Sequence, residues 1–453
     1  MNSGDTAWVL ASAALVFLMT PGLAFFYGGM VRRKNVLNML MMNFATICVV
    51  AVMWVLYGYS LSFSTDAGGG LIGGLSKIGL AGTLNATSGT LPEMAFVAFQ
   101  AMFAIITPAL ISGAVADRMK FGAWIAFVVV WETLVYFPIA HWVFFFDDGK
   151  GGWLGDRIGA LDFAGGTAIH LNAGVAALAL VLVIGKRRGW PKEPMRPHNL
   201  PLVLLGAGML WFGWFGFNAG SAVAANGQAA VAFVNTLVAT SAAALGWIIV
   251  ERLRDGHSTT LGIASGAVTG LVAITPACAS VNPVGAIILG VLAGALCAYA
   301  VGWKYKLGFD DSLDVVGVHG VGGAAGALLI GFLATASVTG ILDKGDGPSG
   351  LFFGGGFAQL GKQAIGVAAV AAYSFVVTWL IAKVLDKIMG LRVDDETESV
   401  GLDQAVHAES GYELGAVSGG GFGQVIRRVE VGAGAGTPAG TAAGTDGKED
   451  GQR

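Results

Sequence analysis

Two histidines lie inside otherwise apolar segments and are the first candidates for chemistry in this sequence. His170 begins the stretch HLNAGVAALAL, and His319 begins the stretch HGVGGAAGALL. An ionisable side chain at membrane depth is costly, so it indicates a functional site unless it only bonds a backbone carbonyl. Neutral imidazole carries one donor and one acceptor nitrogen, so two such rings could share a single proton.

Aromatic rings at helical spacing form a second candidate group. Phe99 and Phe103 are one helical turn apart, and Trp214 and Phe217 are three residues apart in the stretch WFGWFGFNAGS. Ser221 follows one turn after Phe217 and falls on the same helix face. Such rings can simply pack against lipid or neighbouring helices. An aromatic face can also bind a cation, and a hydroxyl can accept a hydrogen bond from ammonium.

The composition places these residues in a membrane protein. Of the 453 residues, 71 are Gly, 55% are hydrophobic and only 12% are charged. A soluble domain carries about 25% charged residues, so a soluble globular enzyme is excluded. The net charge of −3 provides no basic field for nucleic acid. We therefore expect an all-α polytopic membrane protein.

Eleven apolar runs are long enough to cross a bilayer as helices, which takes about 20 residues. They are expected at roughly 7–30, 37–61, 94–116, 121–140, 163–185, 200–222, 229–250, 260–277, 284–303, 314–335 and 361–388. Because no basic stretch precedes residues 7–30, we expect that run to be a retained span rather than a signal peptide. Of the Lys and Arg residues in alternating loops, fourteen fall in one set and five in the other. Positively charged loops stay in the cytoplasm, which predicts an outer N-terminus and an inner C-terminus.

The two histidine-containing runs lie five spans apart and therefore have opposite orientations. An Asp precedes each histidine, Asp162 in the first run and Asp314 in the second. This pattern favours an inverted repeat of spans 1–5 and 6–10, followed by an eleventh helix. The two histidines would then meet near the membrane midplane.

Composition also divides the chain into three parts. Residues 1–390 form the expected transmembrane domain. Residues 391–414 are charged but keep apolar side chains that could dock, so we expect a cytoplasmic regulatory tail there. From residue 415 to 453 Gly, Ala and Thr dominate, and this low-complexity extension is expected to be disordered.

Neither a metal, a cofactor nor hydrolase chemistry is expected. Cys48, Cys278 and Cys297 lie in apolar runs without metal-ligand spacing and are expected to be small buried hydrophobes. Ser221 and His319 could form the dyad of an intramembrane hydrolase. The sequence has no GxSxG motif, however, and His170 would then have no role.

The sequence is similar to the ammonium transporter family (Amt/Mep, related to the Rh proteins), and within it to the bacterial Amt branch. The similarity runs in the expected order over about residues 5–413. Its most specific stretches are LDFAGGTAIHLNAG, PHNLPLVLLGAGMLWFGWFGFNAGS, DDSLDVVGVHGVGGAAGAL and, in the tail, LRVDDETESVGLDQAVHAESGY.

The resemblance implies a homotrimer with one pore per subunit, and it implies roles for particular residues. An outer vestibule that recruits ammonium would contain Phe99, Phe103, Phe144, Trp214 and Ser221. Phe103 and Phe217 would gate the pore, while His170 and His319 would line it. Asp162 and Thr275 would support the site structurally and electrostatically.

Two positions depart from the family pattern. Family members commonly carry Trp where this chain has Phe144, and Phe is the weaker cation–π partner and lacks the indole N–H. Trp142 or Trp153 could take over that part of the cage. Glu132 lies within the fourth span and has no family role that we can assign. We expect it to face a subunit interface or to pair locally.

The expected protein is a multi-pass transporter of the plasma (cytoplasmic) membrane, the inner membrane of a bacterial cell. It would recruit ammonium, deprotonate it and conduct ammonia. The sequence leaves open whether the proton also crosses, by a separate relay. Methylammonium would be an analogue, and lipid and a PII-family signalling protein on the cytoplasmic face would be partners. An Rh-like electroneutral channel is the nearest alternative. A sensor is another, although the 63-residue tail is short and Gly-rich for a signalling domain.

Overall fold

The computed structural model describes residues 1–342 and 345–412, and Met1–Gly411 form one compact unit. The predicted extension at 415–453 lies outside the described residues, as does the end of the predicted tail segment 391–414. The described chain is mostly helical, which confirms the predicted all-α membrane fold class.

The described residues contain one sheet, a two-stranded hairpin, and all other regular elements are helical. The α-helices are α1 Ser3–Met30, α2 Val36–Met53, α3 Tyr59–Phe63, α4 Glu93–Ser112, α5 Phe121–Trp131, α6 Phe137–Phe144, α7 Asn172–Ile184, α8 Leu200–Gly220, α9 Gly227–Asp255, α10 Thr260–Ile274, α11 Pro283–Ala300, α12 Trp303–Leu307, α13 Gly322–Leu333, α14 Ala336–Thr339, α15 Ala358–Met389, α16 Asp395–Val400 and α17 Leu402–His407. Tight or wide helical turns are η1 Arg33–Asn35, η2 Trp54–Gly58, η3 Ile78–Leu80, η4 Gly113–Val115, η5 Glu132–Tyr136, η6 Trp153–Ile158, η7 Gly166–Leu171, η8 Val316–Val321 and η9 Leu351–Phe353. The strands β1 Thr87–Ser88 and β2 Leu91–Pro92 pair antiparallel.

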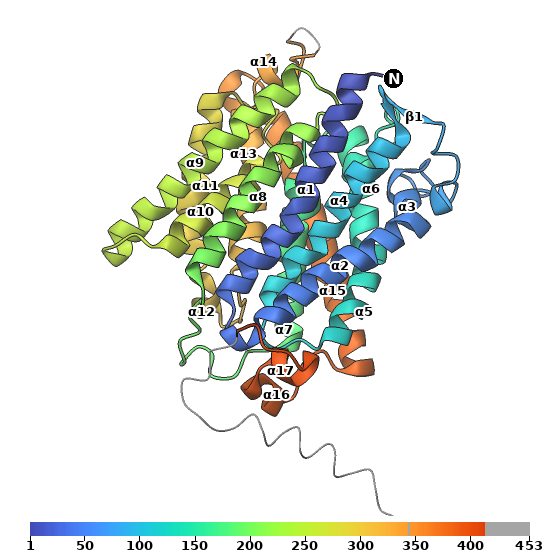
Figure 1. The fold of residues 1–453 in the computed structure, drawn as a ribbon. Helices are drawn as coiled ribbons and strands as arrows, with labels where there is room; N and C mark the ends of the chain where they lie inside the picture. The colour runs from blue at the N-terminus through green and yellow to red at the C-terminus, as the bar shows by residue number, and fades with distance from the viewer. Residues whose placement is uncertain (343–344, 413–453) are drawn as a thin grey trace, which may run out of the picture. The chain divides into compact units, whose positions relative to one another are not determined.

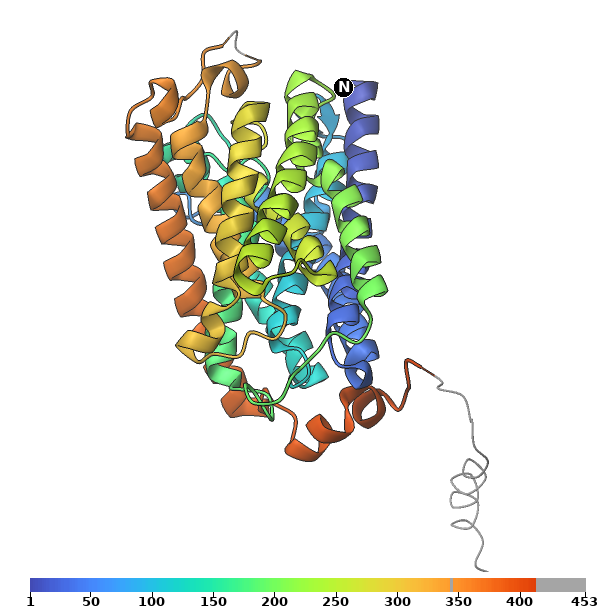
Figure 2. The same ribbon diagram turned by 90° about the vertical axis from the view of Figure 1, so that its left-hand side faces the viewer.

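The long helices run between two ends of the bundle (Figures 1 and 2). We call the end that carries the N-terminus the upper end, and the end that carries α16 and α17 the lower end. Ten helical segments in the described chain are long and apolar enough to cross a membrane. The eighth predicted span, 260–277, contains a shorter helix, Thr260–Ile274, of 15 residues. The count of eleven spans, the inverted repeat and the orientation of the termini stay predictions.

Small residues let the helices approach closely. The pairing of α1 with α8 illustrates this, because a side chain at Gly206 would lie 2.3 Å from the backbone nitrogen of Phe26. Helix contacts in membranes rest on van der Waals packing and not on the exclusion of water, so small residues at the interface are favoured. The high Gly content of the sequence therefore has a packing role.

The outward faces of the helices are apolar, as expected for contact with lipid or other subunits. Cys278 and Cys297 are buried as predicted, but Cys48 is exposed and that prediction was wrong. The reason is the helix face: Phe44 and Val52, one turn before and after Cys48, are also exposed. An apolar run alone does not tell which side of a membrane helix faces its neighbours.

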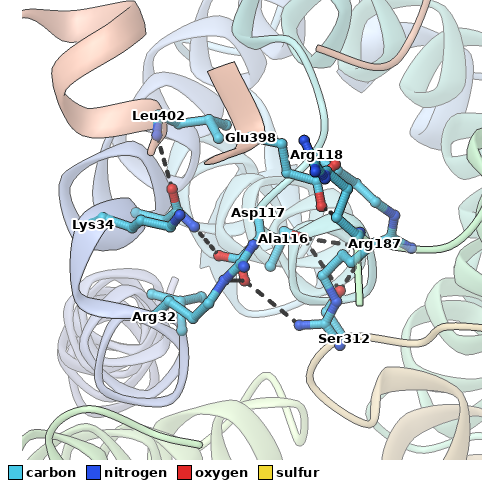
Figure 3. Close-up of polar contacts among 12 residues, drawn as sticks. Arg32, Lys34, Ala116, Asp117, Arg118, Arg187, Ser312, Glu398 and Leu402 are labelled. Carbon is cyan, nitrogen blue, oxygen red and sulfur yellow. Dashed lines mark hydrogen bonds and ion pairs between the residues drawn. The ribbon is translucent and has the colours of Figure 1, made fainter. Parts of the chain in front are cut away.

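A polar network joins the helix ends at the lower end (Figure 3). The Asp117 carboxylate accepts hydrogen bonds from Arg32 Nε at 2.9 Å and from Asn35 Nδ2 at 2.5 Å. The Arg187 guanidinium donates two hydrogen bonds to Asp310, at 2.9 and 2.8 Å. Burial opposes ionisation of Asp310, but the Arg187 contacts outweigh it and hold the pKa of this carboxyl below its ordinary value.

The described part of the tail binds to this network. The backbone N–H of Leu402 donates to Asn35 Oδ1 at 2.8 Å, a contact drawn in Figure 3. The Asp403 carboxylate accepts from the backbone N–H of Asn38 at 2.8 Å, in the first turn of α2. An acidic group in this position satisfies helix N–H groups that would otherwise lack partners. The tail therefore completes the start of the second long helix.

Candidate functional site

The two predicted histidines lie side by side in the interior. His170 is in η7 and His319 in η8, both wide turns that lead directly into α7 and α13. Their Nδ1 atoms are 3.3 Å apart, and the imidazole planes are inclined by only 21°. Both side chains are buried, and among the described residues Nε2 of His170 has no hydrogen-bond partner. The arrangement leaves polar nitrogens in an otherwise apolar interior.

The helices carrying the histidines cross where both lack a side chain. A Cβ atom at Gly174 would lie 2.1 Å from the backbone nitrogen of Gly320 and 2.3 Å from its Cα atom. Gly320 directly follows His319, and Gly174 comes one turn after His170. The glycines therefore set the distance between the two imidazoles.

A carboxylate caps the start of each of these turns. The Asp162 carboxylate accepts backbone N–H bonds from Gly165, Gly166, Thr167 and Ala168, at 2.9, 2.6, 2.8 and 3.1 Å. Burial raises the pKa of the Asp162 carboxyl above its ordinary value, although these hydrogen bonds pull it down. Asp162 thus fixes the start of η7 and with it the position of His170.

Before His319 it is Asp311, and not the nearer Asp314, that caps the histidine turn. Asp311 Oδ2 accepts from the backbone N–H of Val316 at 2.7 Å, at the start of η8. Asp314 instead forms an ion pair with Lys304 at 2.6 Å. The sequence carried a usable signal, because Asp162 and Asp311 each precede their histidine by eight residues.

Aromatic rings enclose the histidine pair on one side. The Phe103 and Phe217 ring centroids are 4.4 Å apart, with planes inclined by 35°. Trp214 stacks on His170 with centroids 5.2 Å apart, and its Nε1 donates to Thr275 Oγ1 at 2.8 Å. The Thr275 contact fixes the indole, and the indole in turn orients the imidazole.

A cavity of about 740 Å³ lies above these rings at the upper end. The described residues that line it include four of the predicted site residues: Phe103, Phe144, Asp162 and Ser221. Ser221 Oγ donates to the Phe217 carbonyl at 2.8 Å. Phe99 and Trp214, which were predicted around the vestibule, are buried behind this wall; Phe99 packs edge-on against Phe103 with centroids 4.8 Å apart.

The expectation that Trp142 or Trp153 replaces the missing indole was wrong. Trp142 Nε1 donates to the Leu71 carbonyl at 2.7 Å, and the two indoles pack against each other with centroids 5.5 Å apart. The described lining of the cavity contains instead three consecutive phenylalanines, Phe144, Phe145 and Phe146. The π surface at this wall is therefore built by phenyl rings.

Glu132 departs from both expectations. It is fully buried within a single chain, so it does not face another subunit, and among the described residues neither carboxyl oxygen has a hydrogen-bond partner. It begins η5, where the wide turn interrupts the fourth span. A buried polar group without hydrogen-bond partners is costly, so Glu132 carries a desolvation penalty that no described residue offsets.

Replacing Glu132 with Met should therefore stabilise the protein. We expect a gain of about 1–3 kcal/mol in the free energy of unfolding, because the substitution removes an unsatisfied buried polar group at similar volume. Thermal unfolding of the purified protein in detergent measures this effect. Glu132→Gln is the matched control and should show little gain, since its amide is equally unsatisfied. A loss of stability in both variants would reveal a partner for the carboxyl.

Comparison with known proteins places this site in a family. The sequence matches the Ammonium Transporter Family profile over residues 7–412. A protein named ammonium transporter from Mycobacterium tuberculosis is 58% identical over 438 residues, which is 92% of each chain. This chain belongs to the ammonium transporter family. Family members are membrane transporters of ammonium and not enzymes, and the chain is accordingly a multi-pass protein of the plasma membrane.

Solved relatives of this transporter share its fold. Mep2 from Candida albicans has a TM-score of 0.81 at 37% identity, with 87% of each chain covered. A structure named Sensor Amt Protein has a TM-score of 0.81 at 30% identity and covers 89% of this chain and 98% of that chain. The ammonium transporter fold thus extends to a protein named as a sensor.

Three further residues line the cavity that sequence reasoning did not select: Tyr59, Lys77 and Glu93. They come from the end of the second span, the following loop and the first turn of α4. No local pattern marks them, because only the folded chain brings these separate segments together.

Proposed function

We propose that this transporter holds ammonium in the upper cavity, removes its proton there and conducts ammonia past the histidine pair. The adjacent buried imidazoles behind the Phe103–Phe217 pair support this proposal most directly. In this scheme Phe103, Phe144 and Ser221 contact the cation, with Phe99 and Trp214 backing them. Phe103 and Phe217 form the gate.

The free-energy cost of burying a charge explains why the substrate would cross as neutral ammonia. Moving a bare ammonium ion into a dry apolar passage costs tens of kcal/mol by the Born estimate. Removing the proton at pH 7 costs only about 4.6 kcal/mol, taking a lysine-like amine pKa of about 10.4 as a guide. Ammonia can then pass a narrow apolar gate and hydrogen-bond to His170 and His319 beyond it.

The same scheme gives selectivity a physical cause. Potassium resembles ammonium in size and charge but has no proton to lose. Selectivity filters for potassium replace the hydration shell with rings of carbonyl oxygens, and the sequence has no TVGYG-like segment. Asp162 and Thr275 act indirectly in this scheme, by holding His170 through the helix start and through Trp214.

We further propose that the protein is a homotrimer and that residues 1–390 form its conducting domain. The segment 391–414 would regulate transport by receiving a PII-family protein on the cytoplasmic face. The attachment of Leu402 and Asp403 to the start of α2 supports a coupling between tail and helices. The extension 415–453 is assigned no role.

Electrical recording on proteoliposomes tests the transport proposal. We expect ammonium to evoke a current that potassium does not evoke, because the proton crosses by a separate relay. An electroneutral ammonium flux would refute the coupled proton path and favour the Rh-like alternative. A protein that binds ammonium without any flux would favour the sensor function, which the likeness to the Sensor Amt Protein brings into consideration.

A further inference from the structure

The upper cavity already contains an ammonium group that belongs to the chain itself. The Lys77 side chain lines the cavity, and its Nζ atom contacts Glu93 Oε1. The same Nζ lies 5.5 Å from the centroid of the Tyr59 ring, within the range of a cation–π contact. A carboxylate and an aromatic face are both groups that can bind a primary ammonium.

The groups around this ammonium are fixed more firmly than the lysine. Tyr59 donates its hydroxyl hydrogen to Glu93 Oε1 at 2.7 Å, and the Glu93 side chain is 6% exposed. Glu93 starts α4, the helix that also carries Phe103. The Lys77 side chain, by contrast, is 29% exposed and extends from the loop before η3. The receptor groups are therefore preorganised, whereas the cation is held on a flexible stem.

We propose that Glu93 and Tyr59 form an outer cation subsite, which Lys77 occupies here and from which substrate ammonium displaces it. The subsite would take ammonium or a small primary alkylammonium. This inference rests on the proposed function, because the displaced lysine leaves the subsite to an ion on its way to Phe103. Lys77 acts as a tethered competitor that weakens the first capture of the substrate.

The negative charge of Glu93 explains why the subsite needs a cation. Without Lys77, the Glu93 carboxylate would lie at the wall of a cavity that Asp162 also lines. Glu93 Oε1 accepts hydrogen bonds from the Tyr59 hydroxyl and from Lys77 Nζ. No hydrogen bond from a described residue reaches Oε2. Only the Lys77 side of this ion pair is partly exposed, so an ion in solution can reach the pair and compete with Lys77 for the Glu93 carboxylate.

Replacing Lys77 with Met removes the competitor and keeps the length of the stem. We expect the KM for methylammonium uptake into proteoliposomes to fall about three- to tenfold, while the maximal rate changes less than about twofold. Lys77→Arg keeps a tethered cation and should leave KM at or above the wild-type value. Lys150→Met removes a lysine from an exposed loop outside the described cavity wall, and it is the matched control.

Glu93→Gln tests the receptor side of the subsite. The amide no longer attracts the substrate, and Lys77 becomes an unpaired cation at the entrance, so KM should rise. The Lys77→Met change in the same chain should reverse much of that increase. Thermal unfolding of each variant shows whether it has a folding defect. If the Glu93→Gln protein does not fold, the Lys77→Met experiment still tests the subsite.

Repeating the assays in about 0.5 M NaCl separates the subsite from a general surface field. Screening at that salt concentration removes effects between distant charges but acts less on groups in contact. A Lys77→Met effect that vanishes in salt, or that Lys150→Met reproduces, would overturn the subsite. An unchanged KM in Lys77→Met, with normal wild-type transport, would also overturn it and leave the proposed function intact. Absence of transport by the wild-type protein would instead refute the proposed function.

Discussion

Replacing His170 with Ala is expected to lower the maximal rate of methylammonium transport by about 5- to 150-fold. An uncharged amine inside a dry passage depends on the few polar atoms that it meets there. His170 Nε2 is such an atom, since it is buried and no described residue satisfies it. Losing one hydrogen-bond partner in a buried site costs about 1–3 kcal/mol, which corresponds to about 5- to 150-fold in rate.

Uptake of labelled methylammonium into proteoliposomes measures this effect. His257→Ala is the matched control, because His257 is exposed in the loop between α9 and α10. We expect the control to keep the wild-type rate. Equal rates for the His170 variant and the wild type would remove the histidine pair from the transport path.

Replacing Gly174 with Val is expected to prevent the native packing of the two histidine helices. The new Cβ atom would lie 2.1 Å from the Gly320 nitrogen, and the obstacle is backbone that cannot rotate away. Overpacking against flexible side chains costs about 1–3 kcal/mol, and a clash with backbone should exceed that range. The yield of folded protein and its thermal midpoint report the change.

The control for this substitution is Gly208→Val in α8. Gly208 is also helical, but no atom lies within 4 Å of its Cβ position. Only a small loss of stability is expected there. Similar behaviour of the two variants would mean that helix propensity, and not the crossing, causes the defect.

The approximate positions of ten long apolar helices in the described chain, and the meeting of the two histidines, could be predicted from the sequence. Apolar runs set helix length directly, and the matching stretches after His170 and His319 indicated a shared site. Their separation of 3.3 Å agrees with the prediction that the two rings meet. These features depend on local periodicity and on internal similarity, both of which a sequence records.

Other features depend on contacts between distant segments and could not be predicted in this way. Asp314 lies closer to its histidine than Asp311 does, yet Lys304 draws it into an ion pair. Trp142 was a reasonable substitute for an absent indole, but its N–H is committed to Leu71. Lys77 and Glu93 meet only because the loop after the second span folds over the start of α4.

The close approach of the two Nδ1 atoms makes the histidine pair asymmetric. For two neutral rings, only one hydrogen can lie between those nitrogens. The ring that keeps it must expose a bare lone pair at Nε2, whereas the other ring must present N–H there. The pair is therefore polar along its axis. Reversing this polarity takes more than one hydrogen: as the shared hydrogen moves to the other Nδ1, that ring must release its Nε2 hydrogen and the first ring must take one up at its own Nε2.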